Sequence, residues 1–138
     1  MNMEINSLGL TAAVTAFLTI WIGHVAVRKV EANTINIKKT MFIAIALGLL
    51  VEYLSLSTSN LQLSTALGIL GITLLWDAFE IYRQEKRIKH GHAPANPNNP
   101  RHAKILAEHS TATKLDLLKR DPVGRQVSPE EAPKLISH

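Results

Sequence analysis

The sequence predicts an all-α fold: a three-transmembrane-helix bundle whose third helix extends into the cytoplasm and is followed by a mostly irregular polar tail. Three apolar runs, close to the length needed to cross a bilayer, predict the helices. The distribution of charge predicts the tail, since only four of the 15 Lys and Arg residues precede residue 83. We therefore divide the chain into a transmembrane domain, residues 1–91, and an extended cytoplasmic tail, residues 92–138.

The first transmembrane helix is expected over residues 7–28. Its apolar run follows Asn6, a residue type suited to capping a helix, and stops at a basic pair. A signal peptide carries basic residues before its core, whereas the only charged side chain ahead of this run is Glu4. We therefore interpret the run as a retained membrane helix, and we expect residues 31–37 to form a short connection.

The second helix is expected over residues 40–57 and the third over residues 61–90. The uncharged turn between them is so short that the two helices must form an antiparallel hairpin. The third run stays apolar to Trp76, and no helix-breaking residue follows before Gly91. Glycine at this position, with Pro94 just beyond, predicts the C-terminal cap of the helix.

The tail, residues 92–138, has the composition of an irregular segment. Residues 92–100 are a Pro- and Asn-rich linker that cannot remain helical for long. A short amphipathic helix is expected over residues 103–119. Its apolar positions are Ile105, Leu106, Leu115, Leu117 and Leu118.

Orientation follows from the basic residues near the helix ends. The segment before the first helix and the turn after the second have no Lys or Arg, whereas the other two helix boundaries are basic. The positive-inside rule therefore predicts an outside N-terminus and a cytoplasmic C-terminus. We expect structural lipids to bind to the protein and no nucleic acid to do so. The basic residues near the helix ends are expected to contact partner subunits or anionic lipid headgroups. They are Arg28, Lys29, Lys38, Lys39, Arg83, Lys86, Arg87 and Lys89.

Four ionisable residues at membrane depth are the candidate functional groups. Glu52 lies inside the second run, either as a proton or cation site or as a hydrogen-bonded carboxylate near the outer interface, which we favour. His24 could ligate a haem or join a proton relay, but an interfacial structural histidine is the favoured interpretation. Asp77 and Glu80 share a face of the third helix, and we expect them to pair with basic groups on the first helix.

Catalytic chemistry has no signature in this chain. The absence of cysteine excludes thiolate metal sites and thiol catalysis, and there is no phosphate-binding loop, nucleophile elbow or zinc-protease motif. The histidines His90, His92, His102 and His109 are too irregularly spaced for a metal site and are expected to be solvated. Small residues form stripes on all three helices and indicate helix–helix contact. We therefore expect neither enzymatic activity nor a cofactor or metal of its own.

The segment from Leu75 to Pro97 resembles the terminal motif of a family of small bacterial membrane proteins known only as a domain of unknown function. The matching residues are Leu75-Trp76, Glu80, Gln84-Glu85-Lys86-Arg87, Lys89, Gly91, Pro94 and Asn96-Pro97, together with His24, Lys29 and Glu31 after the first helix. Val25 stands where the family pattern has proline, and His92-Ala93 where it has aromatic residues. The resemblance spans about residues 5–100 and implies a three-helix membrane protein with no assigned activity. We expect the protein to lie in the bacterial inner membrane.

Three functional hypotheses follow. The first is a small accessory subunit of a multi-subunit bacterial membrane complex, respiratory or otherwise energy-transducing, which braces larger subunits and docks them through its tail. The second is a small proton or ion transporter, or a channel component, that uses Glu52 with His24 and Asp77 as relay groups. The third is a membrane anchor for haem or quinone, with His24 as the candidate ligand.

Overall fold

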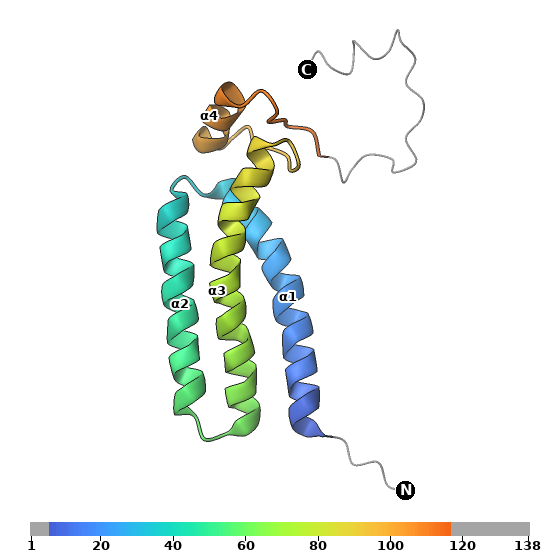
Figure 1. Ribbon diagram of the computed structural model, residues 1–138, viewed down its shortest axis with the longest axis vertical. Helices are drawn as coiled ribbons and strands as arrows, with labels where there is room; N and C mark the ends of the chain where they lie inside the picture. The colour runs from blue at the N-terminus through green and yellow to red at the C-terminus, as the bar shows by residue number, and fades with distance from the viewer. Residues whose placement is uncertain (1–5, 117–138) are drawn as a thin grey trace, which may run out of the picture.

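The computed structural model describes residues 6–116, which fold into four helices without a β-strand (Figure 1). The helices are α1 (Ser7–Asn33), α2 (Ile37–Ser57), α3 (Leu61–Lys89) and α4 (Pro100–Glu108). The first three are long and apolar enough to cross a membrane, and this confirms the all-α class and the three-helix membrane architecture.

Each of the four helices begins at an asparagine. The side-chain oxygens of Asn6, Asn36, Asn60 and Asn99 accept hydrogen bonds of 2.9–3.1 Å from backbone N–H groups in the first turns of α1, α2, α3 and α4. These bonds satisfy donors that have no partner within the helix. In α4 the capping residue Asn99 is followed directly by Pro100, whose fixed φ suits the first helical position.

The three long helices form a single layer with α3 in the middle (Figure 1). α3 packs against α1 on one flank and α2 on the other, whereas α1 and α2 make at most marginal contact with each other. The end of the layer where α1 ends, α2 begins and α3 ends carries all eight basic residues named above, and we call it the basic end. The layer leaves large apolar side chains exposed on all three helices, among them Phe17, Phe42 and Ile72.

α2 and α3 approach closely through small residues. A Cβ atom added at Gly48 would lie 3.1 Å from the carbonyl oxygen of Gly71, so the two backbones have no room for larger side chains there. Near the other end of this interface, Ser55 Oγ donates to the Ser64 carbonyl at 2.8 Å and Ser64 Oγ donates to the Ser55 carbonyl at 2.9 Å. These contacts show that the small residues of α2 and α3 lie at a helix–helix interface.

The glycine that caps the C-terminus of α3 is Gly91, as the sequence predicts. Gly91 has a φ of +73°, its N–H donates to the Ile88 carbonyl at 3.0 Å, and the N–H of His92 donates to the Arg87 carbonyl at 2.8 Å. This pair of bonds is a Schellman motif, which needs a left-handed residue at this position and therefore favours glycine. The chain then turns back toward α1.

Residues 92–116, which we call the cap, pack on the basic end of the layer. Their apolar side chains form a small core with α3, built from Ile88, Ala93, Ala95 and Ile105 and flanked by Leu106 and Ala112. The backbone N–H of Ala95 donates to the Thr113 carbonyl at 2.8 Å, and Thr111 Oγ1 donates to the Lys89 carbonyl at 2.6 Å. The described part of the tail is therefore a folded unit attached to α1 and α3, where the sequence predicts an irregular segment.

Five expected boundaries differ from the structure. α1 continues through the basic pair to Asn33 instead of ending at residue 28, and α2 begins at Ile37 instead of residue 40. Basic residues favour helices, so a membrane boundary does not have to be a helix end. α3 ends one residue before the expected position 90, and the short helix spans Pro100–Glu108 instead of 103–119. Leu115 is exposed, and Leu117 and Leu118 lie outside the described residues.

Candidate functional site

The helix lengths explain why a site forms at the basic end. α2 has 21 residues and is about 31 Å long, which matches the hydrocarbon thickness of a bilayer. α1 has 27 residues and α3 has 29, so each is about 10 Å longer than α2. α1 and α3 begin side by side, with Gln62 bonded to Ser7, at the end of the layer where α2 ends (Figure 1). The extra length of α1 and α3 therefore lies at the basic end, where it forms a platform outside the apolar region on which the cap rests.

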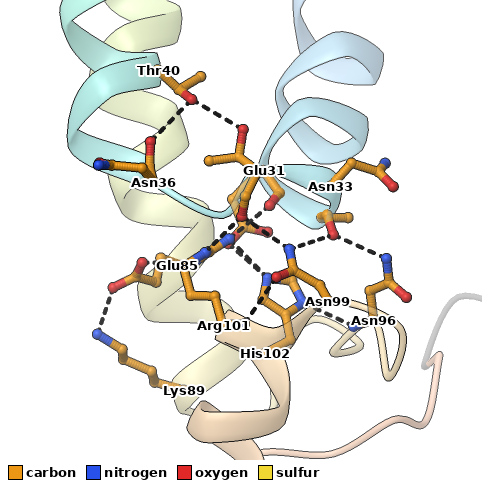
Figure 2. A network of polar contacts seen from close by, with 12 residues as sticks. Glu31, Asn33, Asn36, Thr40, Glu85, Lys89, Asn96, Asn99, Arg101 and His102 are labelled. Carbon is orange, nitrogen blue, oxygen red and sulfur yellow. Dashed lines mark hydrogen bonds and ion pairs between the residues drawn. The ribbon is translucent and has the colours of Figure 1, made fainter.

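Polar side chains from α1, α3 and the cap converge on this platform (Figure 2). We call them the Arg101 cluster, which consists of Glu31, Glu85, Asn96, Asn99, Arg101 and His102. Glu31 and His102 are completely buried, and the side chains of Arg101 and Glu85 are each 13% exposed.

Arg101 holds the cluster together. Its Nη1 donates to Glu85 Oε2 at 2.7 Å, and its Nη2 donates to Glu31 Oε1 at 2.6 Å. The same Nη2 also reaches the backbone carbonyl of Glu31 at 2.6 Å, and Nε reaches that of Thr34 at 3.0 Å. One guanidinium thus connects the end of α1 and the side of α3 to α4. The planar arrangement of its donors suits such multiple contacts.

Two asparagines complete the termination of α1. Asn96 Nδ2 donates to the Ala32 carbonyl at 3.0 Å, and Asn99 Nδ2 donates to the Ala32 and Thr34 carbonyls, both at 2.9 Å. Carbonyl groups in the last turn of a helix have no partner within it and must be satisfied from elsewhere. Here the cap supplies the donors, so the end of α1 depends on a segment more than 60 residues later in the chain.

His102 is held in one tautomer by its neighbours. The backbone N–H of Asn96 donates to Nδ1 at 2.8 Å, so Nδ1 carries no proton and the ring proton is on Nε2. Nε2 donates to Glu31 Oε1 at 3.1 Å, and Arg101 Nη2, which lies 2.9 Å from Nε2, donates to the same oxygen. The ring is therefore neutral. This buried position corrects the expectation that His102 is solvated.

The two carboxylates of the cluster are balanced by Arg101 and by the neighbouring Lys89. Glu31 and Glu85 face Arg101, and Lys89 Nζ pairs with the other oxygen of Glu85, Oε1, at 2.5 Å. Within residues 6–116 the one buried side-chain atom without a hydrogen-bond partner is Glu31 Oε2. The same residues contain no group of three His, Asp or Glu side chains placed to hold a metal ion. Nearly every donor and acceptor of the cluster is hydrogen-bonded, and this geometry suits a structural role in holding the cap on α1 and α3.

The sequence did not single out this cluster as a site. Glu31 was expected in a loop and Arg101 in an irregular tail, because nothing in the local sequence marks either as buried. One local pattern does locate α4: Asn99-Pro100 places a preferred cap residue before a preferred first helical residue.

The predicted intramembrane carboxylates Glu52 and Asp77 lie at different helix contacts. Glu52 on α2 lies against α3, where its Oε1 would be 2.7 Å from a Cβ atom at Gly71. Asp77 on α3 lies against α1, where its Oδ2 would be 2.8 Å from a Cβ atom at Gly23. Within the described chain, no hydrogen bond or ion pair joins Glu52 or Asp77 to the other or to His24.

Glu80 does not make the expected contact with the first helix. Its carboxylate pairs with Arg83 Nη1 at 2.7 Å and with Arg87 Nη2 at 3.4 Å, both on α3 itself. The spacings of three and seven residues place all three side chains on one face of the helix. The ionic connection between helices is made instead by Arg101. His24 is exposed on α1, and its backbone carbonyl accepts a bond of 3.4 Å from Arg28 Nε.

Comparison with known proteins identifies one family. The model of the family described as "Domain of unknown function (DUF4491)" matches residues 6–99. The match includes the three long helices and the glutamates and asparagines of the Arg101 cluster, and it stops before Arg101 and His102. No curated protein and no solved structure matches the chain.

Proposed function

The chain belongs to the DUF4491 family, and from this premise we propose that it is a small accessory subunit of a multi-subunit bacterial membrane complex. Its role would be to brace larger subunits through the helical layer and to present the cap as a docking element. The positive-inside rule favours a multi-pass orientation in the inner membrane with the basic end and the cap in the cytoplasm. A respiratory or other energy-transducing complex remains our choice of assembly.

The single-layer arrangement is the observation that supports this proposal. A layer of three helices with α3 in the middle has two broad faces, and both carry exposed apolar side chains. Within residues 6–116, the contiguous cluster of buried apolar side chains lies between the cap and the end of α3, and not among the three long helices. Such a layer has little interior in which to enclose a substrate or a cofactor. Its small-residue contacts and exposed faces suit packing against further helices.

The relation between cap and layer adds to this proposal. The Arg101 cluster fixes the cap to α1 and α3 through charged hydrogen bonds, so the cap has a defined position relative to these two helices. A docking element is more effective when it is held in its bound arrangement before the partner arrives. An accessory subunit that docks partners needs a cap held in a fixed position, whereas a layer of helices that only contacts lipid does not.

The transporter and anchor hypotheses receive less support. Glu52 faces α3 from α2 and Asp77 faces α1 from α3, so α3 separates the two carboxylates. Gly71 and Asp77 are six residues apart on α3, which adds about 9 Å along the helix axis. A haem held by two histidines needs a second histidine at membrane depth, and the other five histidines lie at position 90 or beyond.

Isolation of the intact complex tests the proposal. The full chain, with an affinity tag, is purified from its native membrane in a mild detergent, and co-purifying proteins are identified and quantified. We expect one or more larger membrane proteins in fixed stoichiometry with the chain. A stable monomer that carries no such partner would overturn the proposal.

A parallel measurement addresses transport. The purified chain alone is reconstituted in liposomes, and proton and sodium flux are compared with those of the Glu52→Gln variant and of empty liposomes. We expect all three preparations to be equal. Flux that depends on Glu52 would replace the accessory role with the transporter hypothesis.

A further inference from the structure

A cavity of about 510 Å³ opens at the basic end between α1, α3 and the first residues of the cap. This volume lies within the range of small-molecule sites in proteins. Its cationic lining consists of Arg28 and Lys29 from α1 and Arg87 from α3. Its apolar lining includes Val25, one turn closer to the membrane, and Ile88. The cavity therefore joins a basic region to an apolar one.

Among residues 6–116, no carboxylate pairs with Arg28 or Lys29. Both side chains are exposed, and no ion pair within residues 6–116 includes either of them. Two carboxylates also line the cavity. Glu31 is bound by Arg101 and His102, and Asp116 has an interaction of its own. The available charge on the α1 side of the cavity is thus positive.

A second cavity of about 310 Å³ adjoins the first and shares Arg87 and His92 with it. Its other lining residues are Arg83, Lys86 and His90, and no carboxylate is among them. The Glu80 carboxylate pairs with Arg83 and Arg87 from outside this lining. Together the two cavities make a continuous basic surface around the end of α3.

The position of the first cavity points to a lipid and not to a soluble anion. α1 is predominantly apolar up to Val27 and basic from Arg28, and α3 changes from apolar to charged after Trp76. The cavity is lined by α1 from Val25 onward and by the charged part of α3 from Gln84 onward, so its α1 side begins where that helix leaves the hydrocarbon region, at the level of lipid headgroups. A ligand that fits a basic region above and an apolar region below has an anionic head and a hydrocarbon tail.

We propose that this cavity binds one anionic phospholipid, with its phosphate held by Arg28, Lys29 and Arg87 and its first acyl carbons against Val25. The lipid comes from the leaflet that faces the basic end. Charge complementarity supplies selectivity for anionic over zwitterionic lipids. This inference does not depend on the accessory role, since the cavity is formed by the chain itself.

The test uses the full chain purified in detergent and titrated with phosphatidylglycerol, with binding followed by native mass spectrometry. The variant R28Q/K29Q removes two cations from the cavity. The matched control K38Q/K39Q removes two cations from the first turn of α2, at the same end of the layer but outside the cavity. All four residues are exposed, and circular dichroism verifies equal helix content.

We expect wild type and K38Q/K39Q to bind phosphatidylglycerol equally and in preference to phosphatidylcholine. For R28Q/K29Q we expect a loss of affinity of roughly tenfold or more, because each basic contact with an anionic lipid contributes appreciably. A second variant, Val25→Phe, narrows the apolar part without removing charge and should also weaken binding.

Three results would overturn the proposal. Equal losses in the two double variants would mean that the basic end attracts anionic lipid only diffusely. Full affinity in R28Q/K29Q would exclude the cavity as the site. Complete displacement of the lipid by inorganic phosphate at equal concentration would show a phosphate site that makes no use of the hydrocarbon tail.

Discussion

The guanidinium of Arg101 lies 2.6 Å from the carboxylate of Glu31, although the two residues are 70 positions apart in the chain. Glu31 is completely buried, and a buried carboxylate is stable only with a cation or hydrogen-bond donors beside it. This pair connects the end of the first membrane helix to the cap. The stability of the cap should therefore depend on it.

Replacing Arg101 by Met should release the cap. The variant leaves Glu31 buried without its cation, and the expected loss is roughly 3–5 kcal/mol. Hydrogen exchange of the cap and of the last turn of α1 measures it, with faster exchange expected in both. The control is Lys104→Met, since Lys104 is 74% exposed and its 3.6 Å pair with Glu108 should contribute less than about 1 kcal/mol. Unchanged protection in R101M would refute the structural role of the pair.

The double variant E31Q/R101M should be more stable than R101M alone. Replacing the carboxylate by a neutral amide removes the unpaired buried charge, so part of the lost stability returns. The measurement is the same exchange experiment. Additive losses would show that the two side chains do not act as a pair.

His102 should exist as the neutral Nε2–H tautomer, because Nδ1 accepts the N–H of Asn96. Long-range ¹⁵N–¹H NMR of the purified chain distinguishes the two ring nitrogens. The variant His102→Phe removes both hydrogen bonds and should cost roughly 2–4 kcal/mol, while His102→Asn keeps an acceptor for Asn96 and should cost less. A proton on Nδ1 would contradict the arrangement.

Gly48→Ala should loosen the contact between α2 and α3. The new Cβ would lie 2.8 Å from Leu75 side-chain atoms and 3.1 Å from the Gly71 carbonyl, so the helices must separate or Leu75 must move. We expect a net loss of about 1–2 kcal/mol, measured as a lower unfolding temperature in detergent. Gly9→Ala is the control, because its Cβ would meet only Asn6 at 3.7 Å or more and should be neutral or stabilising.

Gly91 should tolerate neither Ala nor Asn. Its positive φ disfavours alanine by about 1–2 kcal/mol, and any Cβ there would overlap the Thr111 carbonyl. Asn accepts the left-handed conformation more readily than Ala but has the same Cβ, so both variants should detach the 111–113 segment from α3. Limited proteolysis detects the detachment. A stable G91N with an unstable G91A would mean that only the backbone angle matters.

Most of the fold could be predicted from local sequence. Apolar length predicts the three membrane helices, because a bilayer requires a helix of about 20 residues. Gly91 marks the end of α3 because only a residue tolerant of positive φ closes a Schellman motif easily. The site was harder to predict. Glu31 was expected in the connection after the first helix and His102 in solvent, because charged and polar side chains are usually exposed and no local pattern says which of them will be buried.

The sequence by itself determined the helical class, the three membrane spans and the collection of basic charge at one end. These properties depend on composition and periodicity within a short stretch of sequence, because apolar segments partition into the bilayer and charged segments into water. Only the tertiary structure decided that α1 continues to Asn33 and that the polar segment after Gly91 folds over its end. The physical reason is that the carbonyls of α1 and the Glu31 carboxylate find their donors in Asn96, Asn99 and Arg101, and these partners meet only when the chain is folded.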